Sequence, residues 1–301
     1  MDFSIGSPHK SALWYDYRLY VNLIEAMASL GINYRKNSKN RIYFLGAPRR
    51  HVYPDVGKFD PSANNLALAY CHFEKIKSYN EFRKVFLPSE FVKDAVLNDK
   101  KKHSKLFRKN VFLDNKNRID IIRPFSSLSS TDEVLKTYEC DISFIGSPRI
   151  RPIVEDIIPI VEKHNLSFQI FGPHWHEYKG NKNAVKYVTA NEIPYENIPL
   201  LSSASKISLV DHHQPMNDIG TVSHKYVDLI ASGAFVLSDN NKDAVQHYKG
   251  ITYNSVNELE ELVLFYINDE NARRKQRERQ LDIVQKNSTL LAAKQISQFF
   301  I

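Results

Sequence analysis

The chain has 301 residues, of which 43% are hydrophobic and 25% are charged, and its formal net charge is +7 at pH 7. This length fits two domains of about 100 to 200 residues, and the composition is that of a globular protein rather than a disordered or fibrous one. No window approaches the ~20 apolar residues of a membrane span, and the first residues lack a secretory signal pattern, so we expect a cytoplasmic protein.

The two cysteines, Cys71 and Cys140, stand far apart and neither belongs to a Cys-x-x-Cys pair. This excludes a cysteine zinc site and a disulfide framework. Much of the excess positive charge lies in two runs, residues 100–105 and 273–279. The charge favours anionic partners without choosing among nucleotides, nucleic acid and lipid headgroups. We interpret both runs as solvated faces, with contact to a membrane surface as the alternative.

Short apolar runs alternate with amphipathic helical patterns in residues 1–127. The run LALAY at residues 66–70 is apolar without a break, which is typical of a parallel strand buried on both faces. The alternation predicts a first domain with a doubly wound parallel sheet. The expected strands cover residues 2–5, 41–45, 65–71, 85–87 and 119–122, and the expected helices cover residues 13–30 and 89–97.

A segment rich in serine and threonine at residues 126–131 is interpreted as the linker to a second domain. Residues 140–285 repeat the alternation of strands and helices and predict a second Rossmann-like domain. The tail at residues 286–301 is expected to be a helix. The expected strands of the second domain cover residues 141–145, 168–171, 185–188, 207–210, 234–237 and 250–253, and the expected helices cover residues 153–164, 195–204, 222–232 and 255–266.

Residues 208–239 carry the most information about function. They read as a strand, a polar loop, a helix, a stop at Gly233 and a second strand. The helix has two stripes at three-four spacing, and we expect the apolar one to pack on the sheet while the polar one faces the crevice at the carboxyl ends of the strands. The apolar stripe is Val222, Tyr226, Leu229 and Ile230, and the polar stripe is Thr221, Lys225, Asp228 and Ser232.

The start of this helix has the features of a phosphate site. Gly220 lets the backbone approach a ligand, and the free N–H groups from Thr221, Val222 and Ser223 onward attract anions. Lys225 adds a positive charge one turn further on. Asp228 follows one turn deeper, where it is expected to accept hydrogen bonds from the vicinal hydroxyls of a sugar.

This stretch resembles the nucleotide-sugar signature of GT-B glycosyltransferases, and especially of their CgeB-like group. In that group an arginine and a glutamate three residues apart precede an Ala-x-Gly-Ala turn. Lys225 stands at the arginine position, Asp228 stands at the glutamate position, and residues 231–234 form the turn. Gly220 occupies the position of a further glutamate in the family-4 retaining enzymes, so the stereochemistry of transfer stays open. The resemblance implies two Rossmann-like doubly wound domains that face each other across a cleft, and a C-terminal helix at residues 286–301 that crosses back to the first domain.

Two other loops of the second domain follow strands and contain candidate donor-binding residues. Gly146 precedes Arg149 and Arg151, whose guanidinium groups suit a diphosphate. Gly172 precedes His174 and Trp175, where a ring is placed to stack on a base, the alternative being an aromatic residue that closes the sheet. His212 and His213 are adjacent and therefore point to opposite sides of an extended chain, so we expect no metal site there.

An inverting transfer needs a general base on the acceptor side. Three residues of the first domain are candidates: His72 and Glu74, which follow its third strand, and Asp16, which begins its first helix. The residues do not decide among them.

The resemblance implies transfer of a sugar, such as a hexose, from a nucleotide-diphosphate donor to a hydroxyl acceptor. The acceptor expected is a glycan, a lipid-linked glycan or a protein, in surface glycan or glycoconjugate synthesis at the inner face of the membrane. No metal or other cofactor is expected, and nucleic acid is not the expected partner. Two alternatives stay open: a non-catalytic relative that binds nucleotide or glycan, and an enzyme that glycosylates DNA.

Overall fold

The computed structural model describes residues 1–6, 15–44, 59–70, 82–98 and 116–301. The chain forms two compact units, which are described separately below. The first unit contains Met1–Phe125, Ile219–Thr221 and Asn287–Ile301, and the second contains Ser126–Asp218 and Val222–Lys286. Among the described residues, no helix combines the length and the apolar character that a membrane crossing requires.

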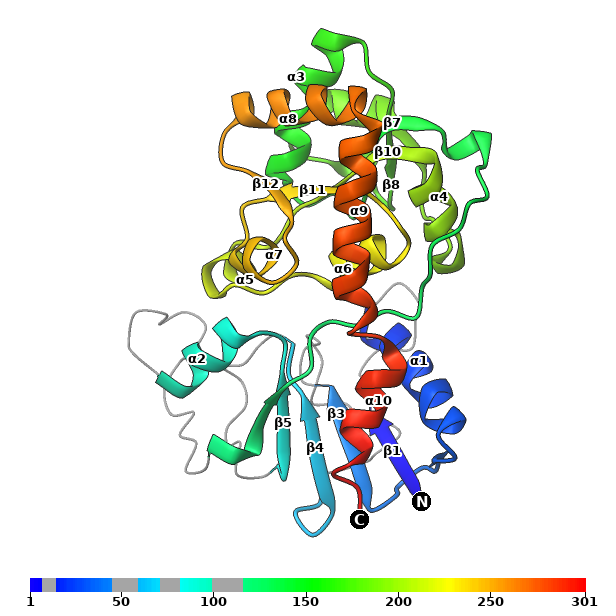
Figure 1. Cartoon of the computed structure of the whole chain (residues 1–301), viewed down its shortest axis with the longest axis vertical. Helices are drawn as coiled ribbons and strands as arrows, with labels where there is room; N and C mark the ends of the chain where they lie inside the picture. Colours follow the sequence, from blue (N-terminus) through cyan, green and yellow to red (C-terminus); the bar gives the residue numbers. More distant parts are fainter. Residues whose placement is uncertain (7–14, 45–58, 71–81, 99–115) are drawn as a thin grey trace. The chain divides into compact units, whose positions relative to one another are not determined.

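The first unit is built on a six-stranded parallel sheet with the order β2-β1-β3-β4-β5-β6 (Figure 1). Five of its strands match the expected positions, and the two-residue strand β2 was not predicted because it is too short to show a pattern. The strands are β1 (Asp2–Gly6), β2 (Asn33–Tyr34), β3 (Asn40–Phe44), β4 (Asn64–Leu68), β5 (Lys84–Leu87) and β6 (Ile119–Ile121).

Helices cover both faces of this sheet. One face packs against α1 (Tyr15–Ser29) and the C-terminal helix α10 (Thr289–Ser297) in a single apolar cluster. The other face packs against α2 (Glu90–Asn98). All five residues of β4 are buried: Leu66, Ala67 and Leu68 pack on the two faces, as the apolar run predicts, whereas Asn64 and Asn65 are buried with their side-chain amides hydrogen-bonded.

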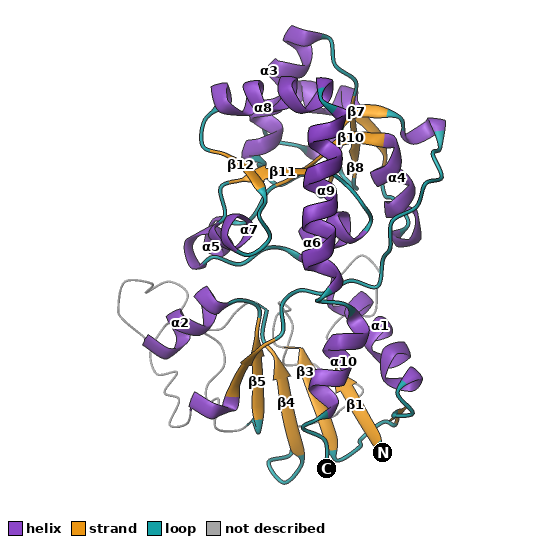
Figure 2. Ribbon diagram, viewed as in Figure 1, coloured by secondary structure: helices purple, strands orange, loops and turns teal. Residues whose placement is uncertain are grey.

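The second unit contains another six-stranded parallel sheet, with the order β12-β11-β10-β7-β8-β9 (Figure 2). The chain starts at β7 in the centre, moves outward to β8 and β9, and returns to β10 before moving outward on the other side. The order therefore reverses between β7 and β10, which makes this pair the topological switch point. The strands are β7 (Cys140–Ile145), β8 (Phe168–Phe171), β9 (Val188–Ala190), β10 (Ser205–Val210), β11 (Val236–Asp239) and β12 (Ile251–Tyr253).

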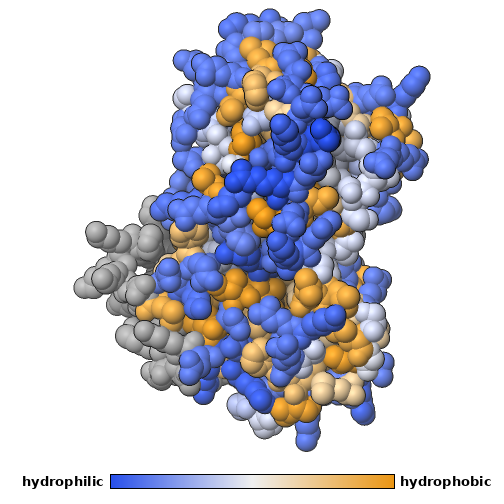
Figure 3. Space-filling view, in the orientation of Figure 1, coloured by the Kyte–Doolittle hydropathy of each residue, from blue (hydrophilic) through white to orange (hydrophobic). Residues whose placement is uncertain are grey.

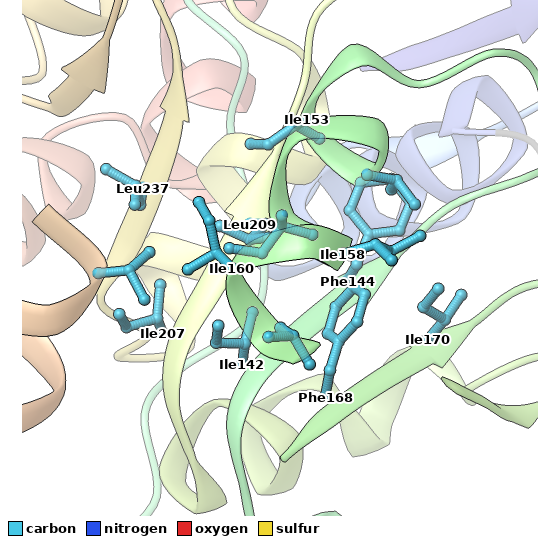
Figure 4. Close-up of a cluster of buried hydrophobic side chains, with 14 of the residues drawn as sticks. Ile142, Phe144, Ile153, Ile158, Ile160, Phe168, Ile170, Ile207, Leu209 and Leu237 are labelled. Atoms are coloured by element: carbon cyan, nitrogen blue, oxygen red, sulfur yellow. The ribbon is translucent and has the colours of Figure 1, made fainter. Parts of the chain in front are cut away.

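Alternate side chains of these strands enter two apolar clusters. Ile142, Phe144, Ile207 and Leu209 face the cluster that contains α3 (Pro152–His164) and α8 (Val256–Asn268) (Figure 4). The opposite face packs against α4 (Ile198–Ala204) and α6 (His224–Ala231). The remaining helices of the unit are α5 (Gln214–Ile219), α7 (Lys242–Gln246) and α9 (Glu270–Gln285).

Serine caps fix the starts of several helices where the sequence predicts them. The Ser89 hydroxyl accepts a hydrogen bond from the Val92 amide at 3.2 Å, and the Ser255 hydroxyl accepts one from the Glu258 amide. Each cap satisfies an N–H group that has no partner inside its helix. Both predicted helix starts are confirmed.

One predicted strand is wrong in position. Residues 185–188 were expected as a strand, but Lys182–Tyr187 forms a 3-10 helix, and β9 begins only at Val188. The Asn181 side chain accepts a hydrogen bond from the Asn183 amide and so initiates the helix. Local capping by an asparagine outweighs the strand preference of a short apolar run.

The basic run at residues 273–279 lies on α9, whose surface in the second unit is largely hydrophilic (Figure 3). Arg273 is an exception because it is buried and donates to the Tyr266 and Ile267 carbonyls at the end of α8. It therefore caps α8, while most of the other charged side chains of the run are exposed. The run at residues 100–105 lies outside the described residues.

Gly172 is required by a close approach of two chain segments. A Cβ atom at this position would lie 2.0 Å from the Gly146 carbonyl oxygen, a distance that neither backbone can tolerate. We expect Gly172→Ala to destabilise the second unit by about 2–3 kcal/mol, measured by calorimetric unfolding. Gly31→Asn is the control, because Gly31 has open space around it and asparagine accepts its positive φ of 74°. An equal loss in both variants would contradict this explanation.

Candidate functional site

The carboxyl ends of β7 and β10 define the candidate site. The two strands pair directly, with Leu209 opposite Phe144, so the loops that follow them begin side by side. In open α/β sheets ligands bind at this position, outside the switch point. The loop after β7 contains Arg149 and Arg151, and the loop after β10 begins with Asp211.

Asp211 binds both arginines. Its Oδ1 atom lies 2.7 Å from Arg151 Nη1, and its Oδ2 atom lies 3.2 Å from Arg149 Nη2. The Asp211 side chain is 1% exposed, the Arg151 side chain 7% and the Arg149 side chain 29%. A charge removed from water in this way is tolerated because it is paired and hydrogen-bonded.

Further hydrogen bonds fix Arg151. Its Nε atom donates to the Ser147 carbonyl at 2.9 Å, and its backbone N–H donates to the Tyr178 hydroxyl at 3.2 Å. Burial lowers the pKa of Arg151, and the Asp211 charge opposes that shift. The guanidinium group is therefore held in one orientation before any ligand arrives.

Lys225 of α6 is the third cation. Its Nζ atom donates to the Ile145 carbonyl at 2.6 Å and lies 4.6 Å from the centre of the Phe144 ring, so it reaches the end of β7 as the polar stripe predicts. Burial, followed by the positive charge of Arg151, lowers the pKa of Lys225 to about 7. Burial and the charge of Arg149 also lower the pKa of His213, on the loop after β10.

The cluster has more positive than negative charge. Arg149 and Arg151 share the carboxylate of Asp211, while Lys225 bonds to the Ile145 carbonyl and feels the charges of both Asp211 and Asp239. The buried Nε atom of Arg149 has no hydrogen-bond partner among the described residues. Such a donor is costly to leave unpaired. An anion with several oxygen atoms, such as a diphosphate, would supply both the missing charge and the missing acceptor.

A hydrogen-bond network holds the loop that carries Asp211. Asp239, at the end of β11, accepts from the His212 backbone amide at 3.0 Å and from Asn217 Nδ2 at 2.8 Å, and its Oδ1 atom lies 2.6 Å from His212 Nδ1. Asn217 accepts in turn from Asn241 at 2.8 Å. The His212 hydrogen bonds lower the pKa of Asp239, although burial acts in the opposite direction and is the larger single effect. The end of β10 is thereby tied to the end of β11.

Asp228 accepts two hydroxyl hydrogen bonds. Ser126 Oγ lies 2.6 Å and the Tyr195 hydroxyl 2.9 Å from its Oδ1 atom. Burial and the Asp228 charge raise the pKa of Tyr195, which keeps this phenol protonated as a donor. Asp228 therefore connects α6 to the first residue of the second unit, and it is half-buried.

The start of α6 differs in part from the prediction. Ser223 is the N-cap and its hydroxyl accepts from the Tyr226 amide, so this hydroxyl acts within the helix. The Val222 side chain is 2% exposed and packs in the core of the second unit. Gly220 has the positive φ of 73° expected of a tight turn, but it and Thr221 belong to the first unit, where the Ser89 hydroxyl donates to the Gly220 carbonyl at 2.7 Å.

Trp175 is not placed to stack on a base. Its side chain is 2% exposed, its Nε1 atom donates to the Gly146 carbonyl at 2.9 Å, and its ring packs edge-on against Phe144. The alternative prediction, an aromatic residue that closes the sheet, is the correct one. Gly146 and Gly172 permit this close packing, whereas the neighbouring His174 side chain is exposed.

Three residues are the candidate bases. His72 and Glu74 lie outside the described residues. Asp16 lies in the first turn of α1. All three remain candidates for the acceptor side.

Sequence reasoning missed Asp211, Ser126 and Tyr195. A signal for Asp211 was present, because an acidic residue directly follows the buried apolar strand ISLV at residues 207–210. Ser126 and Tyr195 gave none, since a linker serine and a tyrosine before a helix are both common.

The two parallel six-stranded sheets with flanking helices have the GT-B fold, which is the fold of the glycosyltransferase structures compared below. Residues 151–292, most of the second unit and the start of α10, match the family described as glycosyl transferase-like. Comparison with curated proteins found no significant match. The matched segment includes Arg151, Asp211, Lys225 and Asp228.

Solved structures of the same fold cover the whole chain. A DNA-modifying β-glucosyltransferase, determined with and without uridine diphosphoglucose, is 14% identical with a TM-score of 0.63, and the match covers 99% of each chain. A sucrose-phosphate synthase from Thermosynechococcus elongatus is 11% identical with a TM-score of 0.59, covering 99% of this chain and 98% of the other. A T4 phage β-glucosyltransferase in complex with UDP and Mn²⁺ is 12% identical with a TM-score of 0.59, and covers 99% of each chain. At these identities the likeness establishes the fold.

Asp211→Asn tests the central ion pair. The variant leaves two partly or fully buried arginines without a counter-charge, so we expect a loss of about 3 kcal/mol in the free energy of unfolding, measured with urea. Asp282→Asn is the matched control, because Asp282 pairs with Lys286 on the surface at 70% and 71% exposure, where a loss below about 1 kcal/mol is expected. Similar losses in both variants would show that Asp211 does not have this role.

Lys225 predicts a pH dependence of stability. Its pKa is about 7 in the folded chain against 10.5 for a lysine in water, so between these values the unfolded chain binds more protons than the folded one. The free energy of unfolding must then rise with pH between about 7 and 10.5. Below pH 7 the folded chain carries the full cost of burying the ammonium group. We expect the stability difference between wild type and Lys225→Met to rise from pH 7 to pH 10 in urea titrations. A difference that does not change with pH would contradict the assignment.

Proposed function

We propose that the protein is a glycosyltransferase that uses a nucleoside-diphosphate sugar as donor. The observation that carries the proposal is the arrangement of Arg149, Arg151 and Lys225 around Asp211 at the switch point of the second unit. The GT-B fold and the glycosyl transferase-like match over residues 151–292 support it.

The diphosphate of the donor would bind to the three cations. Arg149 offers its unpartnered Nε–H, and Lys225 offers an ammonium group near its midpoint of titration at neutral pH. A bound diphosphate stabilises the protonated form and raises the pKa of Lys225, because opposite charges favour ionisation. Binding of the donor would therefore draw a proton onto Lys225 and complete the positive site.

The ribose of the donor would bind at Asp228. The hydroxyls of Ser126 and Tyr195 already donate to this carboxylate, at 2.6 Å and 2.9 Å, so the environment accommodates hydroxyl donors. Vicinal ribose hydroxyls are donors of the same kind. In this proposal they join or replace the two protein hydroxyls.

During transfer, negative charge grows on the departing diphosphate. Cations that are fixed beforehand stabilise this charge with little reorganisation. The two guanidinium groups, aligned by Asp211, would supply this stabilisation without a metal ion. A base on the acceptor side, among His72, Glu74 and Asp16, would take the proton of the acceptor hydroxyl.

The acceptor is proposed to be a hydroxyl of a glycan, a lipid-linked glycan or a protein, with a hexose as the transferred group. The exposed basic residues of α9 suit an anionic surface, such as the inner face of a membrane. We propose that the protein acts in the cytoplasm, in surface glycan or glycoconjugate synthesis. The CgeB-like resemblance of residues 225–234 points the same way.

Donor binding and turnover test the proposal. We expect Arg149→Met to weaken binding of UDP or another nucleoside diphosphate by roughly tenfold or more, because a charge-assisted contact is worth about 1.5–3 kcal/mol. Calorimetric titration of a panel of nucleoside diphosphates measures this. Arg274→Met is the control, because Arg274 is an exposed arginine of α9 and should bind nucleotide as wild type does.

Hydrolysis of the nucleotide sugar in the absence of acceptor separates an enzyme from a binding protein. Turnover that Asp228→Ala abolishes supports the transferase. Tight binding with no hydrolysis and no transfer would instead support a non-catalytic relative. No binding of any nucleoside diphosphate would overturn the proposed site.

A further inference from the structure

The turn after β8 contains three exposed side chains that can share one metal ion. Among the described residues, His174, His176 and Glu177 are the one group of at least three such side chains whose ligand atoms lie close enough together, within 4.8 Å of one another. His176 Nε2 lies 3.3 Å and His174 Nδ1 lies 4.0 Å from Glu177 Oε1. Ligand atoms around a tetrahedral zinc ion are about 3.4 Å apart, given bonds of ~2.1 Å. A small rotation of these exposed side chains would bring their ligand atoms to the spacing that a zinc ion requires.

The backbone brings two of these side chains, those of His174 and Glu177, into line. Trp175–Glu177 forms a 3-10 turn with His174 as its N-cap, and the Glu177 amide donates to the His174 carbonyl at 2.9 Å. Three residues per turn bring positions i and i+3 into line, so His174 and Glu177 lie one above the other. His174 has a φ of 62°, a left-handed conformation that few residues other than glycine adopt.

Buried neighbours anchor the turn on both sides of His176. Trp175 is buried and bonded to the Gly146 carbonyl at 2.9 Å. Tyr178 is also buried, and its hydroxyl accepts from the Arg151 amide and bonds to Glu155. The turn is therefore rigid before an ion binds, and the exposed ligands lose only their own side-chain freedom.

The chemistry of the three ligands selects the ion. Two imidazole nitrogens with one carboxylate suit Zn²⁺ and its neighbours such as Co²⁺, whereas Mg²⁺ and Ca²⁺ prefer oxygen ligands. We propose that His174, His176 and Glu177 form a binding site for a divalent transition-metal ion, with Zn²⁺ the best match and solvent in the remaining positions. The proposal does not depend on the proposed transferase function, because the ligands belong to a different loop from the cations of the donor site.

The full chain, treated with a chelator and then titrated with Zn²⁺ by calorimetry, tests this site. His174→Asn removes a ligand while keeping a residue that tolerates the left-handed conformation, and Glu177→Gln removes the charge with little change in shape. Removing a residue that only hydrogen-bonds to a metal ligand lowers the metal affinity roughly 10- to 100-fold. Removing the ligand itself should therefore weaken Zn²⁺ binding at least tenfold in each variant. Titration with Co²⁺ should give ligand-field absorption in the wild type, and neither variant should reproduce it.

His164→Asn is the matched control, since His164 also pairs with a glutamate, Glu260, but belongs to no such group of three within the part of the chain that the structure describes. It should bind Zn²⁺ as the wild type does. Zn²⁺ should also raise the midpoint of thermal unfolding in the wild type and in this control, and not in His174→Asn or Glu177→Gln. The inference is overturned if these two variants bind Zn²⁺ as tightly as the wild type, or if the wild type shows no binding.

Discussion

The second unit depends on one buried carboxylate that holds two guanidinium groups. Asp211 stands at the end of a central strand, and its two oxygens bind Arg149 and Arg151 at 3.2 Å and 2.7 Å. Burying three charges together is costly unless each has partners, and the hydrogen bonds around them provide these. The arrangement leaves an excess of positive charge at the position where an α/β sheet accepts its ligand.

The excess charge is maintained by the fold rather than by flexible surface residues. Asp239 ties the loop after β10 to the end of β11, so Asp211 cannot turn away from the arginines. Lys225 approaches from α6 and is forced toward its neutral form by burial and by the nearby cations. The site therefore carries an unfavourable like-charge interaction that the proposed diphosphate donor would relieve, and donor binding and protonation of Lys225 would then be interdependent.

Tight packing connects this site to the neighbouring loop. The absence of a side chain at Gly172 brings the ends of β7 and β8 together, and Trp175 bonds across them to Gly146. Tyr178 then bonds to the Arg151 amide. An ion held by His174, His176 and Glu177 would thus bind to a turn that is hydrogen-bonded to the loop of Arg149 and Arg151. The ion itself would lie outside the cluster of cations.

The sequence by itself determined the elements whose signals are local. Ten of the eleven strands expected along the chain share at least half of their residues with an observed strand, and Ser89 and Ser255 cap their helices because capping involves residues only a few positions apart. The apolar stripe of α6 is buried, since helical spacing alone fixes which side chains share a face. Lys225 reaches the strand ends for the same reason.

Only the tertiary structure decided which distant residues meet. Asp211 and Arg151 are 60 positions apart and come together because β10 pairs with β7, a choice among strand orders that no local pattern contains. Trp175 looked like a residue for a ligand and is part of the core, because the space beneath its turn depends on helices and strands elsewhere in the chain. Periodicity and capping act over a few residues, whereas strand order and burial are settled by the packing of the whole unit.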